Sequence, residues 1–526
     1  MNGDELIVGI DLGTTASAIS YINVYGKPEI IPNREGDRTT PSVIFFEADG
    51  TPIVGSEARN LALVEPRRVV RFIKREMGNP SFRFNVDGRD YFPEDLSAMI
   101  LRKLKNDAEA YLGQEVKKAV ISVPAYFKDA QRECTRQAGE IAGLDVVRII
   151  NEPTAAALAY GFERSEEEQT ILIYDFGGGT FDVTIMRIEG NTFTILATDG
   201  HADLGGKEID ERLVNYFAEE FLKTYGTDLR ANPRSRQDLW DKAEIAKKDL
   251  SFRNQIAVAL SSNDSALRVD LDRSLFYELV EDLIWKTEDC MHRVLEDSGL
   301  SWDQIDRVLL AGGSSRMPVV REMIERVTGK EAAWHLNPDE CVALGAAVQG
   351  MVVAQDNISK DATIKEPVSS TTSLEKPIEK PITVTDIAVH SLGVKARSAE
   401  DPSKYVNSII IPRFTPLPCE KTRRFVTNVD NQSRVEFEVL QGEDSDPNSP
   451  QVERIGRAGL SGLPPHKAGE LMIEVTLRYN VDGVIEVVTR ELMSGQVTRE
   501  SIMQKSGSLS KEIIDERKSL ISNMTL

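Results

Sequence analysis

The chain has 526 residues, of which 41% are hydrophobic, and it carries a formal net charge of −21 at pH 7. This length is enough for roughly three or four globular domains. So acidic a chain lacks the overall basic charge typical of proteins that neutralise nucleic-acid phosphates, and we expect no nucleic acid partner.

The cysteines and histidines exclude several kinds of chemistry. The four cysteines lie far apart with no C-x-x-C pair, and the five histidines show no H-x-x-H or H-E-x-x-H spacing. We therefore expect no disulfide framework, no zinc site and no serine–histidine or cysteine–histidine catalysis.

The chain start lacks a basic segment followed by a long apolar run, and no later run reaches about 18 apolar residues. We expect a cytoplasmic protein with no membrane partner.

Residues 5 to about 355 alternate strand-like and helix-like stretches, which predicts α/β layers. Residues 117–127 predict a buried strand that stops at Pro124, and residues 128–143 predict a helix that ends at a glycine. Residues 95–113 show apolar positions at helical spacing and also end on glycine.

Two strand–turn–strand segments share one pattern, as if the first part of the chain were duplicated. "GIDLGTTASA" places Asp11 and Gly13 after an apolar strand, and "DFGGGTFDVT" places Asp175 and three glycines after another. Glycine lets backbone N–H groups in such turns point at an anion, and threonine hydroxyls can donate to phosphate. Either turn alone is equally well explained as an ordinary hairpin. Together they predict a clamp for a polyphosphate.

Three acidic residues would lie close to those phosphates. Asp11, Asp175 and Asp182 would repel the phosphates unless a cation lies between them. Mg²⁺ supplies that charge and takes oxygen ligands, here largely through water. The P-loop pattern G-x-x-x-x-G-K-[ST] does not occur, and "DFG" has no protein-kinase context.

Two further segments fit a nucleotide site. In "VLLAGGSSRMP" (308–318), a strand is followed by Gly312, Gly313 and Ser314 at a predicted helix N-terminus, with Arg316 beside them. In 243–251 a predicted helix carries one polar stripe, made of Glu244, Lys247, Lys248 and Ser251. Taken alone, such a stripe is usually a solvated helix face.

The pattern changes after residue 355. Residues 355–381 are rich in Ser, Thr, Lys and Pro and predict an exposed linker. Short alternating runs follow, with a hairpin signal at Asn480, Asp482 and Gly483, and they predict an all-β sandwich. Residues 508–526 predict one short helix with Ile513, Ile514, Arg517 and Ile521 near one face.

Eight motifs in order resemble the DnaK-type, seventy-kilodalton heat-shock chaperone family between residues 5 and 355. They are "GIDLGTTASA", "NREGDRTTPSV", "ISVPAYFKDAQR", "INEPTAAALAYG", "DFGGGTFDVT", "LGGKEID", "LAGGSSRMP" and "NPDECVALGAAVQ". A weaker match continues through "HSLGV" and "DNQSRVEFEVLQGE" to about residue 505. The resemblance implies an α/β actin-like duplicated two-lobe ATPase domain (1–355), a polar linker (356–385), a β-sandwich peptide-binding domain (386–505) and a short helix with a truncated lid (506–526).

The resemblance also implies ATP/ADP and Mg²⁺ as cofactors, with K⁺ as a further candidate. The residues implied to bind nucleotide are Gly13, Thr14, Thr15, Ala16, Gly177, Gly178, Gly179, Gly205, Gly206, Glu244, Lys247, Lys248, Ser251, Gly312, Gly313, Ser314, Arg316 and Asp339. Lys74 matches the family's catalytic lysine, which without the resemblance would be taken as a surface residue. The other residues implied in hydrolysis are Asp11, Glu152, Asp175, Thr180 and Asp182, and the three aspartates form the metal set.

Four residues match family positions that relay the nucleotide state to the second domain; they are Pro124, Arg132, Arg148 and Asp386. A J-domain co-chaperone is expected near Arg148 and Asp386, a nucleotide-exchange factor is a further expected partner, and unfolded or extended polypeptides are the expected substrates. Val435 matches the central pocket of the peptide site.

Four departures from the family pattern change the expectations. Lys248 replaces the usual arginine and stacks less well on adenine. The linker "ITVTD" is less apolar than usual, which puts ATP-driven docking of the domains in doubt. Arg397 and Asn428 stand where small or apolar residues arch over the peptide, so we expect a preference shifted toward acidic segments. The helical lid is expected to be missing beyond one helix, which would speed peptide release.

We therefore predict an ATP-dependent chaperone with ATPase activity. Two other readings stay open at this point. One is a nucleotide-switched interaction protein with one dedicated partner, which the weak linker and Arg397 favour. The other is an actin-like small-molecule kinase, which would leave the β-module without a purpose.

Overall fold

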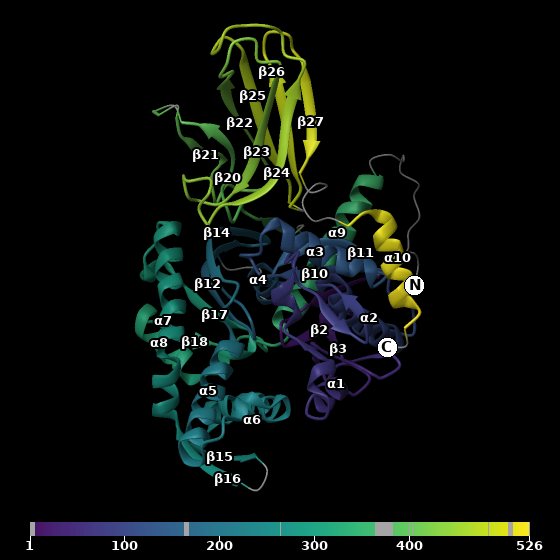
Figure 1. Ribbon diagram of the computed structural model, residues 1–526, viewed down its shortest axis with the longest axis vertical. Helices are drawn as coiled ribbons and strands as arrows, with labels where there is room; N and C mark the ends of the chain where they lie inside the picture. The colour runs from purple at the N-terminus through teal and green to yellow at the C-terminus, as the bar shows by residue number, and fades with distance from the viewer. Residues whose placement is uncertain are drawn as a thin grey trace.

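The computed structural model describes residues 6–162, 168–262, 265–362, 382–398, 400–401, 403–481, 483–502 and 509–524. Figure 1 shows a mixed α/β body with a β-sandwich at one end. No helix among these residues is both long and apolar enough to span a bilayer.

The first lobe (residues 6–151) is built on a six-stranded sheet. Its order is β11–β10–β1–β2–β3, with β4 also paired to β2. The strands β1, β10 and β11 are parallel, whereas β2 and β3 are antiparallel to their neighbours. The bounds are β1 Ile7–Asp11, β2 Ala16–Ile22, β3 Pro28–Ile31, β4 Thr40–Pro41, β10 Lys118–Val123 and β11 Asp145–Asn151.

The second lobe (residues 168–333) repeats this plan. Its sheet has the order β18–β17–β12–β13–β14–β19, again with parallel strands on one side of the first strand and an antiparallel pair on the other. The bounds are β12 Gln169–Phe176, β13 Phe181–Glu189, β14 Thr192–His201, β17 Arg307–Ala311, β18 Ala332–Ala333 and β19 Thr383–Thr385. Apart from β4 in the first sheet and the edge strand β19 in the second, strand order and direction correspond one to one between the two lobes.

Helices and smaller sheets surround these two sheets (Figure 1). The helices are α1 Ser56–Leu61, α2 Pro93–Leu112, α3 Asp129–Ile141, α4 Glu152–Phe162, α5 Gly206–Tyr225, α6 Pro233–Phe252, α7 Arg273–Ser298, α8 Pro318–Thr328, α9 Cys341–Ala362 and α10 Lys511–Ser522. The smaller strands are β5 Val43–Phe46, β6 Pro52–Val54, β7 Val69–Arg71, β8 Phe84–Val86, β9 Arg89–Tyr91, β15 Gln255–Ser262 and β16 Ser265–Asp272. The 3₁₀ turns are Pro66–Arg68, Ile73–Glu76, Leu229–Ala231, Trp302–Gln304 and Gly313–Arg316. The helix predicted over 95–113 ends as expected, with Gly113 at φ 66°.

The helices α4 and α9 pack against each other between the two lobes. α4 also contacts β11, β12 and β13, and α9 lies on β1, β2 and β10. Their contact is close because Gly345 has no side chain: a Cβ there would lie 1.6 Å from the carbonyl oxygen of Ala155. The joint between the lobes therefore depends on small residues.

The predicted all-β module is a pair of four-stranded sheets around a common apolar core. The strands are β20 Leu392–Arg397, β21 Tyr405–Ile411, β22 Cys419–Val426, β23 Arg434–Gln441, β24 Glu453–Ser461, β25 Met472–Tyr479, β26 Ile485–Glu491 and β27 Val497–Ser501. The predicted hairpin joins β25 to β26, where the Asn480 N–H donates to the Val484 carbonyl (3.1 Å). Asp482 lies outside the described residues.

The segment predicted as linker is structured at both ends. Residues 356–362 continue α9, residues 363–381 lie outside the described residues, and β19 adds a parallel strand to the edge of the second sheet. The side chains of Ile382 and Ile387 flank β19 and are buried in the apolar core between the lobes. The predicted domain limits stay predictions.

The C-terminal helix α10 packs on α2 and α3 of the first lobe. Ile521 is fully buried there, and Arg517 forms an ion pair with Asp95 (3.3 Å). Ile514 packs against the same core, whereas Ile513 is 39% exposed and does not share the packed face that the sequence predicted for it.

We expect Gly345→Ala to destabilise the protein by about 1–3 kcal/mol, the usual cost of overpacking a core. Gly161→Ala in α4 is the matched control, because its Cβ would meet the ends of the Phe193 and Ile188 side chains and no backbone atom among its nearest neighbours. Urea unfolding followed by circular dichroism would measure both. Equal midpoints for the two variants would contradict the role of the Gly345 contact.

Candidate functional site: the cleft between the lobes

A cavity of about 730 Å³ lies between the two lobes. Most of the residues predicted to bind nucleotide or to act in hydrolysis line it, and they come from both lobes, whereas Gly179, Asp182, Gly205 and Gly206 are not among the lining residues. The predicted residues that line it are Asp11, Gly13, Thr14, Thr15, Ala16, Lys74, Glu152, Asp175, Gly177, Gly178, Thr180, Glu244, Lys247, Lys248, Ser251, Gly312, Gly313, Ser314, Arg316 and Asp339. The structure therefore gathers into one site residues that are up to about three hundred positions apart.

The two predicted phosphate turns touch each other. A Cβ on Gly178 would lie 2.2 Å from Thr15 Oγ1, and a Cβ on Gly179 would lie 2.4 Å from Thr14 Cγ2. A Cβ on Gly205 would lie 2.4 Å from the Gly179 nitrogen. Glycine is required here by this close approach of the two lobes, in addition to any approach of a phosphate.

Lys74 lines the cavity together with the acidic residues Asp11, Glu152 and Asp175. It is buried and forms an ion pair with Glu152. Burial disfavours the charged ammonium, but Glu152 and Asp11 more than offset this, and the pKa of Lys74 is raised. Lys74 therefore stays charged over the whole physiological range.

The three aspartates of the predicted metal set have raised pKa values; Asp175 and Asp182 are buried, and Asp11 is half-buried. Burial and the nearby Glu152 raise the pKa of Asp11 to about 7 and that of Asp182 to about 8. The same two causes raise the pKa of Asp175 well above its usual range. Without a bound cation, these carboxyl groups therefore hold protons near neutral pH.

The residues present fit a hydrated cation better than a directly ligated one. Asp175 lines the cavity, and its Oδ2 is buried and accepts no hydrogen bond, which leaves an acceptor of this carboxyl group unused. Among the described residues, no three His, Cys, Asp or Glu side chains converge as a metal-binding group. An Mg²⁺ ion held by Asp11, Asp175 and Asp182 would thus need water or phosphate oxygens to complete its coordination.

The polar stripe on α6 lines the cavity, and of its four residues only Lys248 is also exposed to solvent. Lys247 forms an ion pair with Asp210 (2.8 Å) and donates to the Gly206 carbonyl (3.2 Å). Lys248 forms an ion pair with Glu244 (2.6 Å). Burial would raise the pKa of Glu244, but Lys248 and its neighbours hold it at about 2. Glu244 is therefore an ionised acceptor at the cavity wall.

The third glycine turn differs slightly from its prediction. Gly312 has φ 74° and precedes a short 3₁₀ turn, and α8 begins only at Pro318. The Ser314 hydroxyl donates to the Gly177 carbonyl (2.8 Å), and this bond ties the turn to the second phosphate loop. Arg316 forms an ion pair with Asp339 (2.7 Å).

Several cleft residues on the first lobe were not predicted. Arg75 donates to the Gly179 carbonyl (2.6 Å) and pairs with Glu208, and Arg71 pairs with Asp241 (3.4 Å) across the cleft. The aromatic ring of Phe72 lies 6.0 Å from that of Trp240. The basic run "RRVVRFIKR" (67–75) was the available signal, but only Lys74 was selected from it.

The four predicted communication residues lie at or near the contact with the sandwich. Pro124 ends β10, and Arg132 donates to the Ala125 carbonyl (3.2 Å) and to Asn151 in β11. Asn151 in turn donates to Asp386 (3.0 Å). Burial raises the pKa of Asp386, and the nearby Arg132 and Arg148 oppose this shift.

A second connection was not predicted. The Tyr126 N–H donates to Asp182 (3.2 Å), so the loop after β10 reaches the acid cluster. The Tyr126 carbonyl lies 3.4 Å from His390 Nε2, and the two rings are in edge contact with centroids 4.7 Å apart. No local sequence signal links Tyr126 to His390, because they are far apart in the chain.

The predicted peptide-binding residues lie on the sandwich, away from the cleft. Arg397 ends β20 over the ring of Tyr405 (5.2 Å), Asn428 follows β22, and Val435 is half-buried in β23. Their role stays a prediction.

Comparison with known proteins identifies the relatives of this chain. A family model described as "Hsp70 protein" matches residues 7–84 and 77–524. "Chaperone protein DnaK" of Thermotoga petrophila is 42% identical over 499 residues, which cover 94% of this chain and 79% of the relative. The proteins of the same name from Thermotoga maritima and Thermotoga neapolitana match to the same extent.

We expect Mg²⁺–ADP binding at pH 7 to release protons, because a cation displaces them from carboxyl groups whose pKa lies near or above 7. Asp182→Asn should release fewer protons than the unmodified protein. Calorimetry in buffers of different ionisation enthalpy measures the difference, and the nucleotide's own titration cancels between the two proteins. Identical proton release would contradict a protonated Asp182.

Proposed function

Because the chain belongs to the Hsp70 family, whose members are ATP-hydrolysing chaperones, we propose that it grips extended polypeptide segments in its sandwich and couples that grip to ATP hydrolysis in the cleft. Chaperone and ATPase activity follow from the family. The docked linker strand β19 carries the proposal of coupling, since it joins the sandwich to the ATPase lobes.

We assign the two lobes to the duplicated actin-like fold. The matching strand order and direction in the two sheets support this assignment. On this assignment residues 1–355 form the ATPase domain, and residues 386–505 form the peptide-binding sandwich.

In the cleft, ATP lies with its phosphates against Gly13–Ala16 and Gly177–Gly179 and its base toward Lys248, Ser251 and Arg316. Mg²⁺, when bound, neutralises phosphate charge. Lys74 holds a permanent positive charge where negative charge develops during hydrolysis, and Glu152 fixes its position. Thr180 and Asp175 lie beside the second phosphate turn, where they orient the attacking water.

Coupling starts at Asp182 and follows the contacts to the sandwich. Asp182 accepts from Tyr126, and Tyr126 contacts His390, which lies between the linker and β20. In parallel, Asn151 holds Asp386. A change of charge at the cleft therefore has two short routes to the sandwich. The polar composition of the linker does not prevent docking, because β19 uses backbone hydrogen bonds and its apolar flanks are Ile382 and Ile387.

The proposed partners are extended polypeptides, a J-domain co-chaperone beside Arg148 and Asp386, and a nucleotide-exchange factor, with the cytoplasm as the proposed location. The preference for acidic segments rests on Arg397. The dedicated-partner alternative gains no support from the docked linker, since a docked linker is what a general chaperone cycle needs.

We expect ATP to accelerate release of a fluorescent extended peptide at least tenfold over ADP, because the ATP-bound state grips less tightly. Lys74→Ala should keep this acceleration and lose ATP hydrolysis by about 10²–10³-fold, the usual cost of removing a transition-state contact. Stopped-flow fluorescence and phosphate release measure the two effects. Equal release with ATP and ADP, with hydrolysis intact, would contradict coupling.

Substituting the linker strand tests the route. Val384 packs partly against the core between the lobes, whereas its neighbour Thr383 is exposed. Val384→Asp should abolish ATP-accelerated peptide release and leave basal hydrolysis intact, because a carboxylate cannot be buried there without a partner. Thr383→Asp adds the same charge on the exposed side and should behave like the unmodified protein. Normal ATP-accelerated peptide release in Val384→Asp would contradict the role of β19 in coupling.

A further inference from the structure

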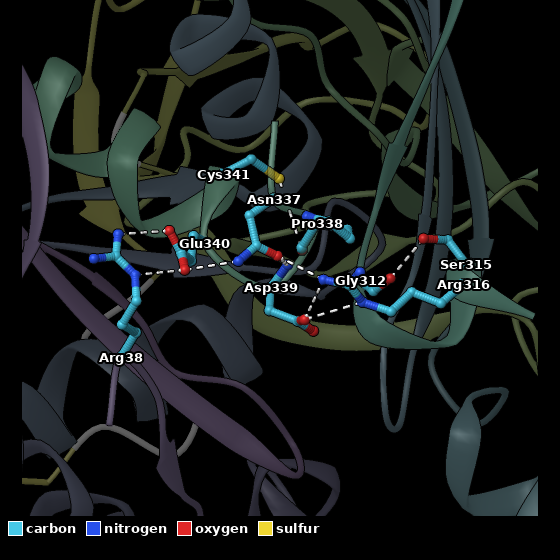
Figure 2. Close-up of polar contacts among 9 residues, drawn as sticks. All are labelled: Arg38, Gly312, Ser315, Arg316, Asn337, Pro338, Asp339, Glu340 and Cys341. Atoms are coloured by element: carbon cyan, nitrogen blue, oxygen red, sulfur yellow. Dashed lines mark hydrogen bonds and ion pairs between the residues drawn. The ribbon is translucent and has the colours of Figure 1, made fainter. Parts of the chain in front are cut away.

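A chain of polar contacts connects Arg316, at the end of the cavity where we place the nucleobase, to the first lobe (Figure 2). Arg316 Nη2 donates to Asp339 Oδ2 (2.7 Å) and to Asn337 Oδ1 (2.6 Å). Asn337 Nδ2 donates to Glu340 Oε1 (2.7 Å). Two parallel bonds, 2.7 and 2.8 Å long, then join Glu340 to the guanidinium of Arg38.

These residues come from three parts of the fold. Arg38 lies between β3 and β4 of the first lobe, and Arg316 lies in the turn before α8 of the second. Between them, residues 337–340 lead into α9, the helix that packs between the lobes. The Pro338 carbonyl accepts from the Gly312 N–H (2.9 Å), so this bridging segment is also fixed to the second lobe by its backbone.

Glu340 is the central member of the chain. Its side chain is only 10% exposed, and both of its oxygens accept hydrogen bonds from Arg38. Those bonds lower the pKa of Glu340 although burial opposes the shift. A buried, ionised carboxylate with a bidentate partner has a well-defined position, and through Asn337 it restricts the plane of the Arg316 guanidinium.

We propose that Glu340 and Arg38 are positioning residues for the base of the bound nucleotide, acting through Asn337 and Arg316. The inference rests on the proposed nucleotide site, where the glycine turns take the phosphates and a fixed guanidinium plane stacks on the purine. Because Arg38 belongs to the first lobe and Arg316 to the second, the grip on the base also depends on closure of the lobes.

The test compares a ligand that has a base with one that has none. Binding of Mg²⁺–ADP and of Mg²⁺–tripolyphosphate is measured by calorimetry. Glu340→Gln should weaken ADP about tenfold, the effect of losing one charge-assisted contact, and change tripolyphosphate less than twofold. Arg38→Gln, at an exposed side chain that should not affect folding, should shift ADP in the same direction. The double variant should be no weaker than Glu340→Gln alone, because the residues act as one unit.

Glu288→Gln is the matched control. Glu288 forms a similar bidentate pair with Arg326 (3.1 and 2.6 Å) in the second lobe, and neither residue lines the cavity. This variant should bind both ligands normally.

In the Glu340 and Arg38 variants, KM for ATP should rise while the single-turnover rate at saturating ATP stays unchanged, since Lys74 and Glu152 are untouched.

Two results would overturn the inference while leaving the proposed function standing. One is an equal loss of ADP and tripolyphosphate affinity, which would indicate general distortion of the cleft. The other is unchanged ADP affinity in both single variants. Failure of the unmodified protein to bind ADP would overturn the proposed function, and the inference with it.

Discussion

The buried negative charge between the lobes is the constraint on which the rest of the structure depends. Asp11, Glu152, Asp175 and Asp182 converge near one ammonium, that of Lys74. Such an arrangement is costly unless the carboxyl groups keep protons or a cation joins them. A Mg²⁺–nucleotide complex brings both the cation and the phosphates, so its binding and hydrolysis change the electrostatic state of the site.

That change can reach the sandwich because one of the acids is also a structural acceptor. Asp182 accepts from the backbone of Tyr126, and the ring and carbonyl of Tyr126 contact His390. No large displacement is needed in the cleft itself, because a backbone hydrogen bond responds to whether its acceptor is a carboxylate or a neutral acid. Asp182 thus belongs both to the acidic cluster of the cleft and to the series of contacts that leads to the sandwich.

Local signals predicted the parts of the fold and site that are made locally. The glycine turns after β1 and β12 and the glycine C-cap of α2 could all be predicted, because each depends on neighbouring residues. The strand β19 was taken for linker, because three residues form a strand only when β14 offers an edge.

In the candidate site too, sequence signals found some residues and missed others whose partners are distant in the chain. Lys74 was found through the family resemblance, whereas its neighbours Arg71 and Arg75 were not, because their partners lie in the second lobe. Arg38 and Glu340 each lie in one of the family motifs, but nothing in either motif pairs one residue with the other. Such contacts are set by the closure of one lobe on the other, which a single sequence does not encode in any one segment.

The sandwich contacts both lobes, and this gives lobe closure a mechanical consequence. On the first lobe, Tyr479 donates to Asp129 (3.1 Å) and Lys128 pairs with Glu453 (2.9 Å). On the second lobe, Arg413 bonds to Asp297, and β19 extends the sheet. A rotation of one lobe relative to the other cannot preserve all these contacts, because packed interfaces do not deform continuously. On the proposed function, a bound nucleotide that changed the angle between the lobes would therefore also change how the sandwich docks.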